Sequence, residues 1–507
     1  MQYFWFQHNV IDMFTYSIAS IEDIELLFQK RLQERNSDPS YKHSLDNYFD
    51  DFVSGKSIIF VVKNGEEPIG SINLEFCQLT DIVSSYVSGK KYCYLSTFKI
   101  EKIYEGQGHI SKLTKKAEDI ARKLGYQYSI ISCEETNQRV KSIYNHFGYT
   151  EVVAQTQERG HNIVYLGKQL GDGHWKDNGV PLVSVVVPVY NSSNVLRDTM
   201  NCILHQTYTN FELIIVDDGS NDSTLQLISE IAQGDQRVKI IKQAHLGAGI
   251  ARNSGMEEAS GKYILFLDSD DLFLPNMLEV LVNTAETYES DVVTFGFASF
   301  RDNPSNYVSA PCLYDGLEKR LCSSFELKNN IFQKTIAAAW NKFFRRSYLK
   351  DCGLEFQDLP FFNDEYFSRM ALLQSERILY IKDKLLFYRL NSPNNIHSAK
   401  DGSLLFSSVI DALYDTMEKK NLLSTFIESF SVYFADVIYR ALSRARSKEL
   451  FIPILTECKN LLNRCKCGVN LSYLSDDKKN VLEYVSNGNV EATYEYVNRL
   501  SNLSQRV

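Results

Sequence analysis

Two clusters of acidic residues in the middle of the chain have the types and spacing to hold a cation. Asp217-Asp218-Gly219-Ser220 follows the apolar run 211–216, and Asp268-Ser269-Asp270-Asp271 follows the run 263–267. Carboxylate oxygens are the ligands that Mg²⁺ and Mn²⁺ prefer. Carboxylates hold an anionic diphosphate only through such a cation, which also neutralises charge on a departing diphosphate. The alternative is that these acids fill turns and cap helices. Because both clusters follow apolar runs, we favour the cation site.

A second candidate lies near the N-terminus, where Glu105-Gly106-Gln107-Gly108-His109-Ile110 separates an expected strand from an expected helix. Glycines in such a turn let backbone N–H groups approach a phosphate at the helix N-terminus. A G-x-G turn taken alone is equally typical of a loop at the protein surface. The sequence around it must therefore decide between the two interpretations.

The acidic clusters need strands to position them. Four apolar runs, 183–189, 211–216, 238–241 and 263–267, alternate with helical patterns. Such runs are typical of buried parallel strands with helices on both faces of the sheet. In open α/β sheets, ligands bind outside the carboxyl ends of the strands. Both clusters therefore fall on the edge expected to bind ligand.

Different elements are expected in the parts of the chain before and after this sheet. Ser20 to Asp23 forms a capping box that opens a helix. Asn64-Gly65 predicts a hairpin between the runs 57–63 and 68–76, and strands are expected at 92–103 and 129–133. The stretch 168–181 is rich in polar residues and glycines, and it predicts a linker. The chain beyond about residue 400 has a helical pattern. The expected organisation is an N-terminal domain (1–170), a linker (171–181), an α/β domain (182–400) and a helical region (401–507).

Bulk properties exclude some classes. The 507 residues carry a formal net charge of −9, which argues against a general nucleic-acid-binding protein. Ten scattered cysteines indicate free thiols, and the spacing of Cys458, Cys465 and Cys467 lacks the paired knuckles of a zinc site. With no signal peptide and no spanning segment expected, we predict a cytoplasmic protein. The basic run 438–448 leaves peripheral membrane association open, beside a solvated helix face.

The segments around the acidic clusters resemble inverting glycosyltransferases of family 2, which have the GT-A fold. The matching segments are V185-V-V-P-V-Y-N191, Q206-T-Y208, E212-L-I-I-V-D-D-G-S220, G249-I-A-R-N-S-G255 and G261-K-Y-I-L-F-L-D-S-D-D271. The resemblance implies a nucleotide-sugar donor, with UDP the favoured carrier. It implies Mn²⁺ or Mg²⁺ at the DxD residues Asp268 and Asp270. The donor-binding residues it implies are Pro188, Tyr190, Asn191, Asp217, Asp218, Arg252, Asp268 and Asp270.

The same resemblance implies a general base in an acidic pair before an aromatic residue. Here the segment reads Asn363-Asp364-Glu365-Tyr366, so the first acid is replaced by asparagine. We assign Asp364 as the base that takes the proton of the acceptor hydroxyl, with Glu365 as the alternative. Trp340, in a W-x-K segment with Lys342, and Asp271 are assigned to a glycan or lipid-linked acceptor. A lone Trp is also a frequent core residue.

The order of elements over 103–149 resembles the GNAT acetyltransferases, which bind acetyl-CoA at the glycine turn. The resemblance implies a mixed-sheet α+β domain in which Tyr144 protonates the leaving thiolate. Glu75 is a weaker candidate for a base. Glu105 replaces the usual Arg or Gln, and Ile110 replaces a small residue. His109 and His146 are otherwise most simply surface residues. The acetyl-CoA-binding residues it implies are Gly106, Gln107, Gly108, His109, Ile110 and Asn137.

The two resemblances together predict a bifunctional transferase in surface polysaccharide biosynthesis. One half would transfer a sugar, and the other would transfer an acetyl group from acetyl-CoA. The alternative is a glycosyltransferase whose N-terminal domain is an inactive docking or binding module. The departures at Glu105 and Ile110 favour that alternative.

Overall fold

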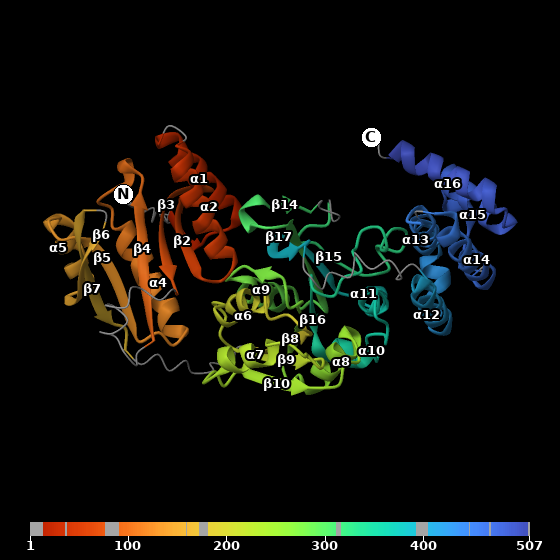
Figure 1. The fold of residues 1–507 in the computed structure, drawn as a ribbon, viewed down its shortest axis with the longest axis horizontal. Coiled ribbons are helices and arrows are strands. Elements are labelled where there is room, and N and C mark those ends of the chain that lie inside the picture. The colour runs from red at the N-terminus through yellow and green to blue at the C-terminus, as the bar shows by residue number, and fades with distance from the viewer. Residues whose placement is uncertain are drawn as a thin grey trace, which may run out of the picture.

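The computed structural model places three groups of elements along one elongated molecule (Figure 1). A mixed sheet with its helices comes first, a second sheet with its helices lies in the middle, and a bundle of helices forms the C-terminal end. This arrangement confirms the predicted mixed α/β architecture with a helical C-terminal region. The described residues are 14–35, 38–76, 91–158, 160–171, 181–310, 316–391, 404–445, 447–465 and 468–504. The expected linker, 171–181, lies outside them except for Gly171 and Pro181.

In the described residues, seven strands form the N-terminal sheet in the order β1-β2-β3-β4-β5-β7-β6. Only β4 and β5 run parallel, and they pair only over Tyr92–Tyr94 and Tyr128–Ile130. Beyond those residues the two strands are not paired with each other, although the Tyr94 and Ser132 hydroxyl groups lie 2.7 Å apart. The strands are β1 (Phe14–Ile18), β2 (Ser57–Asn64), β3 (Glu67–Glu75), β4 (Tyr92–Ile100), β5 (Tyr128–Glu134), β6 (Glu151–Glu158) and β7 (His161–Gln169).

The helices of this sheet begin where the sequence signals indicate. The Ser20 side chain accepts from the Asp23 N–H and the Asp23 carboxylate accepts from the Ser20 N–H, which confirms the capping box. The hairpin at Asn64-Gly65 is also confirmed, since β2 and β3 pair directly across it. The helices are α1 (Ile21–Glu34), α2 (Pro39–Val53), η1 (Lys102–Tyr104), α4 (His109–Lys123) and α5 (Gln138–His146).

The central sheet contains ten strands of the described part. Its main path is β10-β9-β8-β11-β16-β13-β17-β12, with β14 on β13 and β15 on β17. The first four strands of this path are mutually parallel, as predicted. The strands are β8 (Val183–Val189), β9 (Phe211–Asp217), β10 (Val238–Lys242), β11 (Tyr263–Phe266), β12 (Leu272–Phe273), β13 (Val292–Phe300), β14 (Val308–Ser309), β15 (Leu321–Cys322), β16 (Lys342–Arg345) and β17 (Ile378–Arg389).

One expectation about this sheet is wrong. We expected 238–241 to be a buried strand, but β10 lies at the edge of the sheet and Ile240 is 37% exposed. Lys239 and Lys242 lie on either side of Ile240 and Ile241, and charged lysines of this kind are typical of an edge strand. The helices around the sheet are α6 (Leu196–Leu204), α7 (Thr224–Ala232), α8 (Ala248–Glu258), α9 (Met277–Tyr288), η2 (Pro304–Asn306), α10 (Arg346–Cys352) and α11 (Asn363–Leu373).

The C-terminal helices share a hydrophobic core with one face of the central sheet. Phe430 and Phe434 of the tail join the same buried cluster as Phe344 and Phe367. No described helix has the length and apolar character needed to cross a membrane. The apolar residues of the basic run, such as Ile438 and Leu442, are buried in this core rather than presented to a lipid surface. The helices are α12 (Phe406–Lys419), α13 (Leu423–Ser443), α14 (Lys448–Arg464), η6 (Leu471–Tyr473), α15 (Asp476–Asn487) and α16 (Val490–Ser504).

The N-terminal domain packs on the opposite face of the central sheet. Phe49 and Phe52 of α2 belong to one buried cluster with residues of β8, β9 and α6. The Asp50 carboxylate accepts from the Ser305 N–H at 2.8 Å. Gly55 lies directly against α6, because a Cβ atom placed there would be 2.6 Å from the Cys202 Cα. The first two regions of the chain are therefore joined by a continuous apolar interface.

His205, at the end of α6, completes this interface. Burial lowers its pKa to about 4, with Lys91 adding to the shift, so the ring is neutral. Its Nδ1 lies 2.9 Å from the Gly55 carbonyl oxygen, and its Nε2 lies 3.1 Å from the Tyr126 hydroxyl. A neutral ring satisfies both contacts if Nδ1–H donates and Nε2 accepts. Phe76 stacks on the same ring with centroids 4.2 Å apart.

Candidate functional site

The central sheet brings the first acidic cluster to the carboxyl ends of β8 and β9. Val189 and Asp217 are paired in register at these ends. Pro188 is buried within β8, whereas Tyr190 and Asn191 follow the strand into the adjoining loop. Asn191 has a positive φ of 46°, and its side-chain oxygen accepts from the Asn221 N–H at 2.9 Å. The loops after β8 and β9 are therefore tied to each other.

Asp218 is the anchor of a third loop, 243–247, which lies beyond β10. Its buried carboxylate accepts from the Gln243 amide at 2.7 Å and lies 2.8 Å from His245 Nδ1. It also accepts from the backbone N–H groups of Leu246 and Gly247, each at 2.9 Å. Asp218 therefore holds the loop that leads into α8.

Tyr190 and His245 form a stacked pair above this anchor. Their ring centroids are 3.9 Å apart and their planes differ by 18°. The two rings come from different loops, and the Asp218 carboxylate holds the His245 ring through its contact with Nδ1. Flat, polar-edged rings at a strand end can bind a planar nucleobase by stacking.

Arg252, on α8, connects the second acidic cluster to α11. Its Nη2 donates to Asp268 at 2.5 Å, and its Nη1 donates to the Asn363 side-chain oxygen at 2.8 Å. Asn363 stands at the position where an acid was expected, and here it accepts a hydrogen bond from a cation without adding a charge. The three residues come from three separate elements, and they bring the end of β11 beside the start of α11.

The remaining acids of the second cluster differ from each other. Asp271 was expected at the acceptor site, but its side chain is fully buried and accepts from the Arg389 N–H at 2.9 Å. Burial and the carboxylates of Asp270 and Asp268 raise its pKa well above the usual range. Asp270 is half-buried, and its carbonyl oxygen accepts from Arg389 Nε. Asp271 therefore supports the loop beneath Asp268 and Asp270.

The donor atoms at this edge fit a hard divalent cation. Asp268 and Asp270 both keep partly exposed side chains, and both carboxylates add to the effect of burial in raising the pKa of Asp271. Among the described residues, no three His, Cys, Asp or Glu side chains converge as a closed metal site. Two carboxylates are enough for a Mg²⁺ ion that takes its other ligands from water and substrate phosphates.

Asp364 and Glu365 are neighbours in sequence with different surroundings. Burial raises the pKa of Asp364; Arg252 opposes the shift, and Asp268 and Glu365 add to it. Asp364 therefore experiences the charges of Arg252 and Asp268. These two residues, with Asp218 and Asp270, form the edge of the sheet that we call the donor edge. Glu365 instead accepts from the Tyr433 hydroxyl of α13 at 2.7 Å. The first turn of α11 thus divides the two acids between the donor edge and the tail.

Trp340 lies just before β16, and Lys342 is the first residue of that strand. The Trp340 ring is half-buried and stacks on Tyr388, with centroids 5.3 Å apart. Lys342 is fully buried, and burial lowers its pKa to about 7. Its Nζ donates to the carbonyl oxygens of Ile336 and Ala338 at 2.8 and 2.6 Å. Lys342 thus holds the loop 336–338, and Trp340 packs against neighbouring rings.

The N-terminal glycine turn has the expected backbone. Gly106 and Gly108 have φ values of 79° and 80°, and a Cβ atom would meet open space at either position. Gly108 is the N-cap of α4, so the first N–H groups of that helix lack intrahelical partners. Glu105 and Gln107 are exposed. The turn is therefore open to a phosphate.

The other candidate residues of this region differ in their burial from one another, and one of them differs from the expectation. His109 was expected at the surface, but it is buried, and its Nδ1 lies 2.7 Å from the Tyr16 hydroxyl. His146 is exposed, as expected. The side-chain oxygen of Asn137 caps α5 by accepting from the Val140 N–H at 3.1 Å. Ile110 is half-buried at the start of α4.

Tyr144 is buried beside the ring of Phe98, with centroids 5.4 Å apart. Burial raises its pKa, with Cys133 and Tyr94 adding to the shift, so its hydroxyl stays protonated at neutral pH. Glu75, at the end of β3, accepts hydrogen bonds from Asn73 and Ser96. The Glu75 carboxylate is thus held within the sheet.

Sequence reasoning missed three residues that contribute to the central site. His245 and Gln243 reach Asp218 from a loop that the motif does not include, and their residue types gave no signal. Tyr433 reaches Glu365 from a helix 68 residues away in the sequence. An aromatic residue on the apolar face of a helix is indistinguishable in sequence from a core residue.

Comparisons with known families agree with this geometry. Residues 184–353 match the model of glycosyl transferase family 2, and residues 21–149 match that of the acetyltransferase (GNAT) family. EpsH of Bacillus subtilis, whose name assigns it to the glycosyltransferases, is 34% identical over 243 residues. The match covers 46% of this chain and 68% of EpsH.

Two further comparisons cover different shares of the chain. Glycosyltransferase GlyA of Streptococcus pneumoniae is 28% identical over 214 residues, so the match covers 41% of this chain but only 30% of GlyA. The crystal structure of S. aureus TarS residues 1–349 in complex with UDP-GlcNAc superposes with a TM-score of 0.52 at 20% identity. It covers 63% of this chain and 91% of that one, and shows that the fold is shared. The chain therefore belongs to glycosyltransferase family 2 and carries an N-terminal domain of the GNAT acetyltransferase family.

Proposed function

We propose that the chain transfers a sugar from a nucleotide-sugar donor, with UDP the favoured carrier, to a glycan or lipid-linked acceptor in surface polysaccharide biosynthesis. The observation that carries the proposal is the connection made by Arg252. One guanidinium joins Asp268 at the end of β11 to Asn363 at the start of α11. It thereby links Asp268 of the DxD pair to the first turn of α11, where Asp364 follows Asn363.

Each part of the donor would meet a different group of residues. The Tyr190 and His245 rings would stack on the base, and Asp218 would fix that pocket. Pro188, Asn191 and Asp217 support it from β8, β9 and the loop after β8. Asp268 and Asp270 would hold the Mn²⁺ or Mg²⁺ ion, which when bound neutralises charge on the departing diphosphate. Arg252 adds a fixed positive charge at the same edge.

Asp364 would act as the general base. Its carboxylate takes the proton of the acceptor hydroxyl while that oxygen bonds to the anomeric carbon, and the bond from that carbon to the diphosphate breaks on the opposite face. This single displacement inverts the anomeric configuration. A raised pKa brings the base closer to neutral pH, where proton transfer is most efficient.

We also propose that the N-terminal domain transfers an acetyl group from acetyl-CoA. The pyrophosphate would lie at the N-terminus of α4, on the turn formed by Gly106, Gln107 and Gly108. The thioester would lie near β4 and β5. The nitrogen of an acceptor amine would bond to the thioester carbon and lose a proton, for which Glu75 is the candidate base, while the carbon–sulfur bond breaks and Tyr144 protonates the thiolate.

A second candidate role for this domain is docking without catalysis. Glu105 places a negative charge beside the expected pyrophosphate, which opposes binding. The extensive contact of α2 with the central sheet gives the domain a structural role even if it is inactive. In that case its folded presence would still support sugar transfer.

The first test measures both activities in the purified full-length chain. Release of UDP from UDP-sugars in the presence of Mn²⁺, abolished in Asp270→Ala, is the expected result for sugar transfer. Thermal shift with acetyl-CoA tests the N-terminal domain, and ligand at 100 times its Kd stabilises the fold by about 2.7 kcal/mol. A shift that persists in Asp270→Ala supports the bifunctional enzyme. No shift at millimolar acetyl-CoA favours the docking role.

A further inference from the structure

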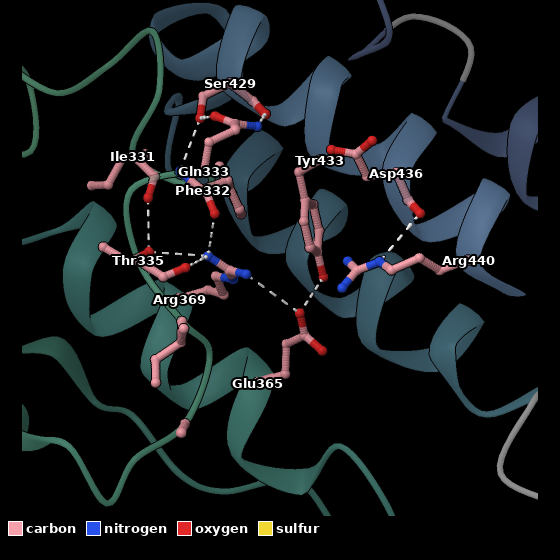
Figure 2. Close-up of polar contacts among 12 residues, drawn as sticks. Ile331, Phe332, Gln333, Thr335, Glu365, Arg369, Ser429, Tyr433, Asp436 and Arg440 are labelled. Atoms are coloured by element: carbon pink, nitrogen blue, oxygen red, sulfur yellow. Dashed lines mark hydrogen bonds and ion pairs between the residues drawn. The ribbon is translucent and has the colours of Figure 1, made fainter. Parts of the chain in front are cut away.

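A polar cleft of about 450 Å³ lies where the tail meets the central domain. Its walls are the loop 332–337, the first turns of α11, and one face of α13 (Figure 2). Ligand-binding pockets have volumes of roughly 300–1,000 Å³. The cleft is thus large enough for a small ligand, and no part of it has a role in the donor site described above.

The first turn of α11 connects this cleft to the donor edge. Successive residues on a helix point about 100° apart. Asn363 points to Arg252, and Asp364 experiences the charges of Arg252 and Asp268. Glu365 points instead into the cleft, toward Tyr433 and Arg369, as Figure 2 shows. A ligand in the cleft would therefore lie next to the residue assigned as the base.

Arg369 and Gln333 hold the walls of the cleft together. Arg369 Nη1 donates to the carbonyl oxygens of Phe332 and Thr335 at 2.9 and 3.1 Å. Gln333 donates to the Ser429 carbonyl at 2.9 Å and accepts from the Ser429 hydroxyl at 2.8 Å. The loop and the tail are thus bonded to each other before any ligand arrives.

The Tyr433 ring is covered by its neighbours. It stacks on Phe332 with centroids 4.8 Å apart, and the Arg369 guanidinium lies 4.9 Å from its centroid. Tyr433 therefore contributes its hydroxyl rather than its face. The side chains of the cleft walls are thus held in place by one another, and the faces of the Tyr433 ring are already in contact with Phe332 and Arg369.

Arg440 is the group left available on the cleft wall. Its side chain is exposed, and among the described residues the guanidinium makes one hydrogen bond, from Nε to the Asp436 carbonyl oxygen at 3.3 Å. The Asp436 carboxylate pairs with Lys478 at 2.8 Å. The cleft is lined by two acids and two arginines, so its formal charges balance. Such a lining offers donors and acceptors to a neutral polyhydroxylated molecule, whereas an anion would also face Glu365 and Asp436.

We propose that this cleft is the acceptor subsite of the enzyme, that it takes a short neutral saccharide, and that Arg440 of the tail binds the hydroxyl groups of that saccharide. The inference rests on the proposed sugar transfer and names the substrate class for it. The helical tail is then part of the active site, and it determines which acceptor is used.

The experiment measures saturation-transfer NMR between the full chain and a panel of p-nitrophenyl glycosides in the presence of UDP. The panel holds neutral hexosides and N-acetylhexosaminides, together with their 6-phosphates. Arg440→Ala is compared with Arg444→Ala, which removes the same charge from an exposed residue at the C-cap of α13, outside the cleft lining. UDP binding is measured separately in all three proteins, so a failure of the donor site is seen independently.

The expected result is binding of neutral glycosides by the wild-type chain, weakened about fivefold or more in Arg440→Ala and unchanged in Arg444→Ala. Equal effects of the two substitutions would overturn the assignment of Arg440. Binding of the 6-phosphates alone, or of no glycoside by a chain that binds UDP, would overturn the neutral saccharide subsite. A wild-type chain that fails to bind UDP would instead count against the proposed sugar transfer.

Discussion

The donor edge of the central sheet and the glycine turn of the N-terminal domain are both proposed to bind a diphosphate group, but they are built differently. At the donor edge, buried side chains bond to one another across separate elements, as Asp218 does with the loop 243–247 and Arg252 with Asn363. The glycine turn is exposed backbone at a helix N-terminus. The first depends on particular side chains, and the second depends on main-chain geometry. Substitutions should therefore damage the first strongly and alter the second only slightly.

The largest effect is expected at Asp364. Replacing it by asparagine keeps the shape but removes the base, so the turnover rate should fall about 10²- to 10⁴-fold while UDP binding is unchanged. Glu365→Gln is the comparison: because Glu365 faces the cleft beside the tail, its loss should raise the acceptor KM rather than lower the turnover rate. A normal rate in Asp364→Asn with a loss in Glu365→Gln would show that the base was assigned to the wrong residue.

The pH profile gives an independent measure of the same group. The base works only when ionised, and burial raises the pKa of Asp364 above that of an ordinary aspartate. The rate should therefore be highest above this raised pKa and fall as pH decreases through it. A profile that stays flat down to the range of an exposed carboxylate would contradict the assignment.

A smaller loss is expected from Asp218→Ala. The substitution leaves the N–H groups of Leu246 and Gly247 without their acceptor, and the free energy of unfolding should fall by about 2–4 kcal/mol. Affinity for UDP should fall as well, because the loop carries His245. Asp222→Ala, nearby but solvent-exposed, is the control. Equal urea midpoints for the two variants would mean that the donor edge is no more tightly built than a surface loop.

The next prediction asks whether the two sites belong to one folding unit. Gly55 and Gly65 both have positive φ values, 71° and 61°, so alanine strains both backbones similarly. Only at Gly55 does the new methyl group meet another chain segment, at Cys202. Gly55→Ala should cost about 1–3 kcal/mol more than Gly65→Ala in the free energy of unfolding. If both cost the same, the interface yields easily and the two regions are loosely attached.

The smallest effect is expected at Glu105. Replacing it by glutamine removes a negative charge near the start of α4, which changes a helix-terminus interaction by about 0.3–1 kcal/mol. Acetyl-CoA should therefore bind about two- to fivefold more tightly. Isothermal titration measures this change, and exposed Glu449→Gln on α14 of the tail is the control. A change of tenfold or more would show that the turn depends on side chains after all.

The sequence predicted most reliably what depends on local pattern. The parallel strands before each acidic cluster, the capping box at Ser20 and the hairpin at Asn64 follow from periodicity and turn chemistry over a few residues. The position of the strand 238–241 at the sheet edge was missed, because strand order is a long-range property. Its lysines at 239 and 242 were the available signal.

The site itself was predictable only where motifs name the residues. Arg252 and Asp268, which two separate motifs name, bond to each other, whereas Asp271 and His109 proved to be buried. Burial of a polar residue depends on which distant backbone group can satisfy it, such as the Arg389 N–H for Asp271 or the Tyr16 hydroxyl for His109. Contacts of this kind are set by tertiary packing and leave no local trace.

The interface around His205 constrains how such a chain can be assembled from older parts. An acetyltransferase module exchanged for another would have to supply a residue without a side chain opposite Cys202, and a ring and hydroxyl in place of Phe76 and Tyr126. If the N-terminal domain were exchanged at the linker alone, the neutral His205 ring and the apolar face of the central sheet that contacts α2 would lose their partners. We therefore expect this pair of domains to be inherited together, and a working transplant to require joint exchange of the segment 49–55 and the end of α6.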